Sequence, residues 1–239
     1  VLTASQILTE YNRGASAKLS ISPASEQDVY QGLVGWWKMD EATTTWDGAG
    51  DRVNDYSGLG NHGTASGDAH ATTTAQYGNA AEFDGTDDYV LLGDPSALNI
   101  SGNITVSSWV KFSVSQNNKP IVARWGTDQS YLLSVDYSSS NKLIFCIRVS
   151  NVNKCAVSVN TYNDGSWHLV TGVFNGFNVL LYVDGGIKEI ITGEATLGPI
   201  DTPAQNVVIG GYNNPNKSFN GLIDDVKIYN FALSAAQIK

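Results

Sequence analysis

The sequence predicts an all-β protein built as a two-sheet antiparallel sandwich or jelly roll, and three observations support this fold class. Of the 239 residues, 42% are hydrophobic and 10% are aromatic, which is too apolar for a disordered chain. The 24 glycines, with abundant Ser, Thr, Asn, Val and Ile, are typical of strands joined by turns. Short alternating segments follow one another without intervening helices, which favours a sandwich or jelly roll.

The strand-like segments begin near residue 33 and continue almost to the end of the sequence. Asn175-Gly176 is a strong hairpin-turn signal between two of them, and Asp184-Gly185 turns the chain into the next. The expected strands include residues 33–39, 104–112, 142–149, 154–159, 167–174, 177–183, 186–191, 206–210 and 222–229.

The two ends of the chain repeat each other, since residues 2–7 read LTASQI and residues 233–238 read LSAAQI. Each copy has the form of a capping box and predicts a short helix. We therefore interpret residues 1–13 as the closing helix of a preceding repeat, residues 14–31 as a linker and residues 32–239 as the domain. This organisation implies neighbouring repeats in the same chain, unless the similarity of two such short strings is a coincidence.

The charge balance excludes two classes of partner. Only 14 Lys and Arg stand against 23 Asp and Glu, giving a formal net charge of −9. Such a chain has no electrostatic drive toward nucleic acid or an anionic membrane surface. No apolar run is long enough for a transmembrane helix, so membrane insertion is not expected.

Six segments together resemble the laminin-G-like, concanavalin A-like jelly-roll superfamily. They are GLVGWWKMDE at 32–41, DYSGLGNHG at 55–63, AEFDGTDDYV at 81–90, SWHLV at 166–170, LYVDG at 181–185 and FNGLIDDVKIYN at 219–230. The resemblance implies a two-sheet jelly roll that ends in a short helix. It implies function less tightly, because the superfamily includes lectins, carbohydrate-binding modules, adhesins and glycan-cleaving enzymes.

Asp224 predicts a calcium site. It falls in the alternating set of Leu222, Val226 and Ile228, and an inward-facing carboxylate is costly unless it is paired or bound to a metal. The resemblance points the same way, since many members of the superfamily hold a structural calcium between the first and last strands. The alternative is that Asp224 accepts hydrogen bonds from backbone amides or lies at a strand end in water.

The remaining calcium ligands are expected from two places. The loop over residues 55–63 offers Asp55, Asn61 and exposed backbone carbonyls, which are the oxygen ligands that calcium prefers. Asp40, after the first strand, is a weaker candidate. The cluster of Asp84, Asp87 and Asp88 around a glycine is interpreted as a turn instead.

No catalytic residues are assigned. Glycan hydrolysis needs two carboxylates across a cleft, and no paired motif of that kind is recognisable. His168, beside Trp167, is interpreted as a strand histidine without chemistry.

A glycan site would combine aromatic faces with planar polar groups. Candidates outside the expected core lie near loops or beside turn residues. They are Arg124, Trp125, Tyr131, Tyr212 and Asn213.

The two cysteines fall in one predicted hairpin. If its turn centres between Ser150 and Asn151, Cys146 faces Cys155 and a disulfide can form. If the turn centres on Asn151, the apolar residues share one face and Cys146 points away. We favour the disulfide, because two such close thiols seldom stay reduced outside the cell.

Together these features predict a non-catalytic carbohydrate-binding or adhesion module, stabilised by calcium, in a multidomain extracellular or cell-surface protein. Its partner would be a glycan or cell-surface polysaccharide. The alternatives are a structural spacer or protein-interaction module in a tandem array and, with less support, a glycan-cleaving enzyme.

Overall fold

The computed structural model describes residues 32–42, 46, 48–136, 138, 141–192, 197–212 and 217–238. The chain divides into two units, residues 1–31 and 32–239. Because the first unit lies outside the described residues, the helix predicted over 1–13 and the linker predicted over 14–31 remain predictions.

The second unit consists of short strands and one short 3-10 helix in the described residues. Every strand listed in the sequence prediction is present, with ends that differ by no more than a few residues. The strands are β1 (Leu33–Trp37), β2 (Arg52–Val53), β3 (Gly63–Ser66), β4 (His70–Thr72), β5 (Ala80–Asp84), β6 (Tyr89–Gly93), β7 (Ile104–Lys111), β8 (Lys119–Trp125), β9 (Gln129–Val135), β10 (Lys142–Val149), β11 (Val152–Thr161), β12 (His168–Phe174), β13 (Asn178–Val183), β14 (Gly186–Thr192), β15 (Val207–Ile209) and β16 (Asn220–Tyr229), and the 3-10 helix is η1 (Ser96–Leu98).

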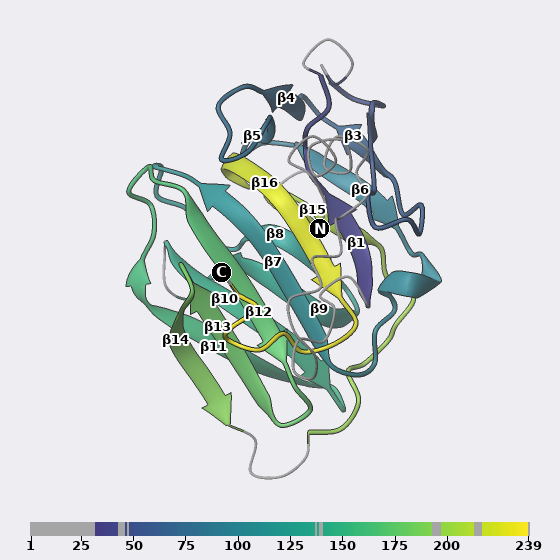
Figure 1. The fold of residues 1–239 in the computed structure, drawn as a ribbon, viewed down its shortest axis with the longest axis vertical. Helices are drawn as coiled ribbons and strands as arrows, with labels where there is room; N and C mark the ends of the chain where they lie inside the picture. The colour runs from purple at the N-terminus through teal and green to yellow at the C-terminus, as the bar shows by residue number, and fades with distance from the viewer. Residues whose placement is uncertain are drawn as a thin grey trace, which may run out of the picture. The chain divides into compact units, whose positions relative to one another are not determined.

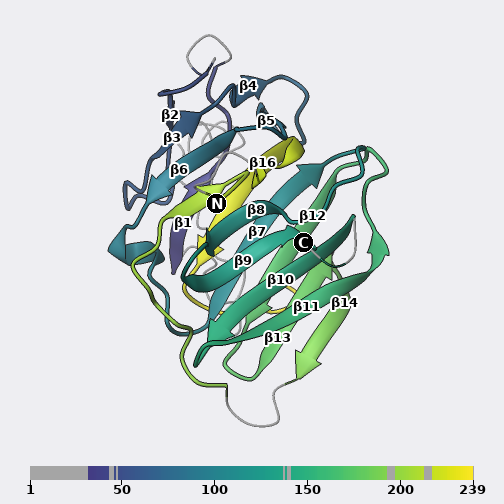
Figure 2. The same ribbon diagram turned by 180° about the vertical axis from the view of Figure 1, so that it is seen from behind.

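Two eight-stranded antiparallel sheets form the predicted sandwich. Sheet A has the order β14-β13-β12-β7-β16-β5-β4, with β1 also paired to β16, and Figure 1 views the molecule from this side. Sheet B has the order β11-β10-β9-β8-β15-β6-β3-β2 and is nearer the viewer in Figure 2. Neighbouring strands in both sheets often come from distant parts of the chain, as a jelly roll requires.

The predicted hairpin turns are present. Asn175 accepts hydrogen bonds through its side-chain oxygen from the backbone N–H groups of Phe177 and Asn178, at 3.1 and 2.8 Å. Asp184 and Gly185 both adopt positive φ, 51° and 73°, which suits the tight turn between β13 and β14. These local signals therefore set the register of β12, β13 and β14.

The main core lies between the sheets, where their inward-facing side chains meet. Gly172 in β12 shows how closely they approach, because a Cβ on it would lie 2.1 Å from the ring of Phe145 in β10. Large side chains fill the same layer and are fully buried. They include Trp37, Phe83, Phe145, Phe174, Ile104 and Ile121.

The C-terminal segment has the predicted capping residues. Ser234 donates through its hydroxyl and its backbone N–H to the side-chain oxygen of Gln237, at 2.8 and 2.9 Å. Leu233 and Ile238 are buried on either side of this turn. In the described residues the segment makes a single turn, so the short terminal helix that the sequence predicts is absent there, because only one turn of helical hydrogen bonding forms after Ser234.

Candidate functional site

Sheet B has a second apolar surface, on the side that faces away from the main core. Cross-strand pairing joins one row of small and apolar residues over four adjacent strands. The row consists of Ala123, Leu132, Cys146 and Cys155. Trp125 and Tyr212 pack against this row, which belongs to a cluster separate from the main core. Ala123, Leu132 and Cys146 are buried, and Trp125, Cys155 and Tyr212 are half-buried, so the cluster forms the floor of this face of the sheet.

Two cavities on this face share four lining residues and form what we call the sheet B groove. Their volumes are about 260 and 480 Å³. The shared residues are Asn118, Trp125, Gln129 and Tyr212. The larger cavity also reaches Gln205 and Lys217. The groove thus combines two predicted ligand residues, Trp125 and Tyr212, with amide groups and one ammonium group.

Hydrogen bonds fix the polar residues of the groove. The Tyr212 hydroxyl donates to Oδ1 of Asn118 at 3.2 Å, and burial raises the pKa of Tyr212 to about 12. Nη1 of Arg148 donates to Oε1 of Gln129. Sequence reasoning did not find Asn118 and Gln129, because nothing in their local sequence distinguishes them from other turn and strand amides.

The wall of the groove contains the predicted disulfide. Cys146 and Cys155 are direct partners across β10 and β11, with their Cα atoms 4.1 Å apart, and are disulfide-bonded. Ser150 and Asn151 both have positive φ, which centres the two-residue turn between them. Of the two predicted registers, the structure has the one in which the cysteines face each other.

Arg124 does not belong to the groove, contrary to prediction. Its side chain is fully buried, pairs with Asp94 at 2.7 Å and donates to the carbonyl of Pro203 at 2.6 Å. Successive strand residues point to opposite faces, so Arg124 faces away from the groove that its neighbour Trp125 lines. Its role is to tie β8 to two loops.

Tyr131 was also wrongly predicted as a ligand residue. It is the cross-strand partner of Arg124, belongs to the main core and donates its hydroxyl to the carbonyl of Leu98 at 3.1 Å. Burial raises its pKa. The remaining candidate, Asn213, lies outside the described residues.

Asp55 and Asn61, two predicted calcium ligands, hold their own loop together. The Asp55 carboxylate accepts hydrogen bonds from the backbone N–H groups of Trp36, Ser57 and Asn61 and from the Ser57 hydroxyl, at 2.8–2.9 Å. The Asn61 carbonyl accepts from the Trp37 indole at 2.9 Å. These contacts anchor the loop on β1 and occupy both Asp55 oxygens.

Asp224 does not face the main core, and the predicted alternation over Leu222–Ile228 is wrong. The core-facing residues of β16 are Ile223, Val226 and Ile228. A bulge between Asp224 and Lys227 shifts the register, with Asp225 at φ 49°. Asp224 pairs instead with Trp109, on the outer face of sheet A.

Asp224 is nevertheless fully buried, because a loop covers it. Its Oδ2 accepts hydrogen bonds from the backbone N–H groups of Gln76 and Tyr77 at 3.0 and 2.9 Å, and the Tyr77 ring packs edge-on against Trp109. Its Oδ1 has no hydrogen-bond partner among the described residues. Burial and then the neighbouring Asp225 raise the pKa of Asp224 to about 7, although the two amides oppose this shift.

Asp40 contacts the same loop. Its Oδ1 accepts a hydrogen bond from the backbone N–H of Asn79 at 3.0 Å, and its charge also raises the pKa of Asp224. A buried carboxylate with an unpartnered oxygen, close to a second carboxylate, fits a hard cation with oxygen ligands. Of the four predicted ligands, Asp224 is the buried carboxylate with an unpartnered oxygen among the described residues, and Asp40 is an exposed carboxylate near it, whereas Asp55 and Asn61 have structural partners.

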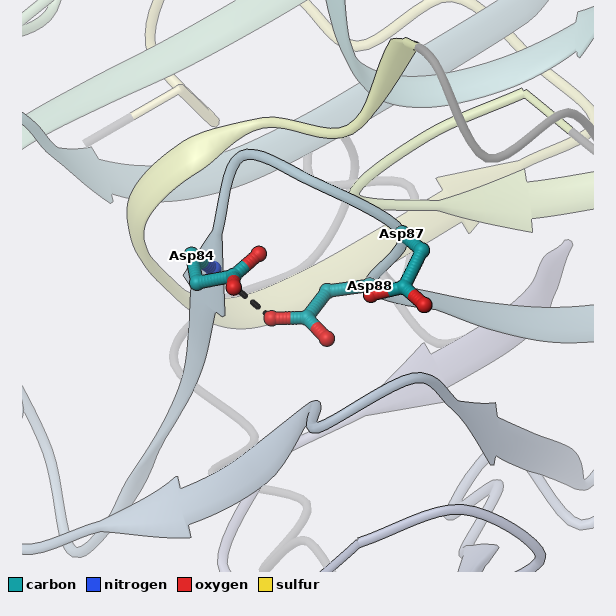
Figure 3. A group of neighbouring side chains, drawn as sticks. All are labelled: Asp84, Asp87 and Asp88. Carbon is teal, nitrogen blue, oxygen red and sulfur yellow. Dashed lines mark hydrogen bonds between the residues drawn. The ribbon is translucent and has the colours of Figure 1, made fainter.

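The acidic cluster forms a turn, as predicted. Asp84, Asp87 and Asp88 lie around the loop that joins β5 to β6 (Figure 3). The Asp88 carboxylate accepts hydrogen bonds from the backbone N–H groups of Asp68 and Asp84 at 2.6 and 2.7 Å. Asp84 in turn accepts from the Thr86 N–H at 2.7 Å. These bonds explain the cluster through the loop itself.

His168 lies between two carboxylates at the start of β12. Its Nδ1 lies 2.9 Å from Asp184 and its Nε2 lies 3.1 Å from Asp164, so a carboxylate contacts each ring nitrogen. Tyr162 packs edge-on against the ring, with the centroids 5.0 Å apart. The arrangement clamps the start of β12 and gives each ring nitrogen a structural partner.

The chain can be compared with known proteins on this basis. The sequence profile of the concanavalin A-like lectin/glucanases superfamily matches residues 84–239. No curated protein matches the sequence significantly. In the described part of the chain, no helix has the length and apolar character needed to cross a membrane.

Solved structures share the fold at low sequence identity. The binding domain of Paraclostridial Mosquitocidal Protein 1 gives a TM-score of 0.67 at 14% identity, over 87% of this chain and 51% of that one. Domain 4 of AbnA, an extracellular arabinanase from Geobacillus stearothermophilus solved with arabinotriose, gives 0.66 at 21%, over 86% and 96%. The receptor binding domain of botulinum neurotoxin mosaic serotype C/D gives 0.63 at 18%, over 88% and 50%.

This chain spans about half the length of the two toxin domains and nearly all of the arabinanase domain. At such identities the likeness concerns the fold. The family match covers most of the described sandwich, including β7 to β16 and the groove of sheet B. The chain therefore belongs to the concanavalin A-like lectin/glucanases superfamily.

Proposed function

We propose that this chain is a non-catalytic carbohydrate-binding module and that the sheet B groove is its glycan site. The observation that carries the proposal is the meeting of Trp125 and Tyr212, from separate parts of the chain, along one groove with amide side chains. Aromatic faces suit the apolar faces of sugar rings, and amides suit hydroxyl groups. The arabinotriose complex of the similarly folded arabinanase domain supports the same ligand class.

We place this module in an extracellular or cell-surface protein with neighbouring repeats, where its binding would serve attachment or adhesion. The Cys146–Cys155 disulfide supports an oxidising compartment. The repeated terminal sequence supports a tandem array.

Glycan binding is tested with immobilised and soluble glycans. We expect the wild-type protein to bind a subset of an array, and Trp125→Ala to weaken that binding at least about tenfold through loss of the stacking surface. Phe177→Ala is the matched control, because Phe177 is exposed in the β12–β13 turn, away from the groove residues. Failure of the wild type to bind any glycan would contradict the proposal and favour a spacer or protein-interaction module.

We also propose calcium as the structural cation, held by Asp224 and Asp40. Added calcium should raise the melting temperature and a chelator should lower it, because the ion binds the folded state. Asp224→Asn should abolish this response. Asp55→Asn should lower stability but keep the response, since its contacts are within its own loop. A melting curve indifferent to calcium and chelator would contradict the site.

A further inference from the structure

Two amide side chains of the sheet B groove have hydrogen-bond donors available for a ligand. Asn118 and Gln129 each have one amide oxygen and one NH₂ group. Both oxygens already accept a hydrogen bond, from the Tyr212 hydroxyl and from Arg148 respectively. Among the described residues, nothing accepts from either NH₂ group. The NH₂ groups of both amides are therefore available to donate to a ligand.

A network at the edge of the groove holds Gln129 in this orientation. Arg148 also contacts Asp201, with Nε 3.7 Å from Oδ2, and donates to Oδ1 of Asn153 at 3.2 Å. Asp201 in turn accepts hydrogen bonds from the backbone N–H groups of Ser150 and Asn151, both at 2.9 Å. The guanidinium that fixes Gln129 is thus itself fixed by the β10–β11 turn.

The charged residues around the groove also favour a ligand that carries hydrogen-bond acceptors and negative charge. Within the described lining there is no Asp or Glu, although the whole chain carries 23 acidic residues against 14 basic ones. Lys217 lines the larger cavity and has no acidic partner among the described residues. Lys119 lies near it: burial and then the Lys217 charge lower the pKa of Lys119, whose ammonium donates to the carbonyl of Gly85 at 3.0 Å.

We propose that the sheet B groove selects acidic glycans, in which a carboxylate or sulfate on the sugar accepts hydrogen bonds from Lys217, Asn118 and Gln129. Such groups carry only acceptors, which complements a lining with spare donors and a positive charge. Trp125 and Tyr212 would contact the ring that bears the group. The inference rests on the proposed function of the groove and adds the charge of its ligand.

The test compares acidic oligosaccharides with neutral counterparts of the same backbone. The pairs are an oligogalacturonate and its methyl ester, sialyllactose and lactose, and a sulfated disaccharide and its desulfated form. We expect at least one acidic member to bind roughly tenfold more tightly than its partner, about the contribution of one charge-assisted hydrogen bond. The preference should shrink as salt screens the charge. Which pair shows it distinguishes carboxylate from sulfate.

Two lysine variants locate the preference. Lys217→Gln should remove most of the acid preference, measured as the ratio of the affinities for the acidic and neutral members of one pair. Lys38→Gln makes the same change of charge beside Trp36 and Tyr56, away from the groove lining, and should leave the preference intact.

The outcomes separate the two proposals. Binding of neutral and acidic members with equal affinity, or an acid preference that survives Lys217→Gln, would overturn this inference and leave the glycan site standing. Binding of no glycan at all would overturn the proposed function itself.

Discussion

At the scale of single residues, strand alternation predicts the wrong face of the sheet for Asp224. Its position in the sequence suggests the core face, yet a bulge moves it to the outer face of sheet A and the loop over residues 76–79 buries it there. The sequence correctly indicated that the Asp224 carboxylate is buried. It did not indicate on which face of the sheet Asp224 lies or which loop covers it. Bulges depend on the neighbouring strands as well as on the sequence of the bulged strand itself.

Asp224 predicts an unusual pH dependence of stability in the absence of calcium. Its pKa of about 7 in the folded state lies above the ordinary aspartate value of 3.8, so the folded protein keeps a proton that the unfolded chain has lost. This group should therefore lower the free energy of unfolding as pH rises from about 4 to 7, by a few kcal/mol at most. Urea unfolding with chelator present would measure it. A matched Asp224→Asn series that has the same slope would show that another group is responsible.

Two of the predicted ligand residues line the groove, and two others do not. Trp125 and Tyr212 were recognisable because large aromatics beside turn residues are common in binding sites. Arg124 and Tyr131 are also residue types that are common in binding sites, but strand pairing places both on the opposite face of sheet B. Asn118, Gln129 and Lys217 join the groove only through tertiary folding, so a one-dimensional pattern does not distinguish them.

At the scale of elements, the pairing of the two cysteines predicted the register of the β10–β11 hairpin better than apolar alternation did. The register that aligns the cysteines has a two-residue turn at Ser150 and Asn151, whereas apolar patterning alone favoured a one-residue shift. The predicted strands 142–149 and 154–159 correspond to β10 and β11, and only the exact pairing required the structure.

The disulfide should stabilise this hairpin and the groove wall. Removing it with Cys146→Ala and Cys155→Ala should lower the free energy of unfolding by about 2 to 3 kcal/mol, as expected for a short closed loop. Denaturant unfolding of the double variant measures the loss. Titration of the unreduced, denatured wild-type protein should detect no free thiol, and two reactive thiols would contradict the pairing.

The contact between β12 and β10 predicts a second effect on stability. Gly172→Ala places a methyl group where the Phe145 ring already lies, so we expect a loss of about 1 to 3 kcal/mol from overpacking. Gly102→Ala is the control, because no atom lies within 4 Å of a Cβ at Gly102. Equal stabilities of the two variants in urea would show that the sheets can separate locally to accept the methyl group.

At the scale of the whole molecule, the outer faces of the two sheets differ. The outer face of sheet A has the Asp224 loop, with Tyr77 against Trp109, and a cavity bordered by the C-terminal turn at Gln237 and Ile238. The outer face of sheet B, nearer the viewer in Figure 2, has the groove lined by Cys146, Cys155, Trp125 and Tyr212. We propose ligand binding for the outer face of sheet B because the groove lies there.

The central claim is that the sheet B groove binds glycan, and nuclear magnetic resonance tests it most directly. The side-chain indole N–H signals of the six tryptophans are monitored while an oligosaccharide that binds is added to labelled protein. We predict that the Trp125 indole and the backbone amides of Asn118, Gln129 and Tyr212 shift with a common affinity, while Trp36 and Trp109 on sheet A stay unchanged. The largest shifts at Trp36 or Trp109, with Trp125 unmoved, would contradict the account.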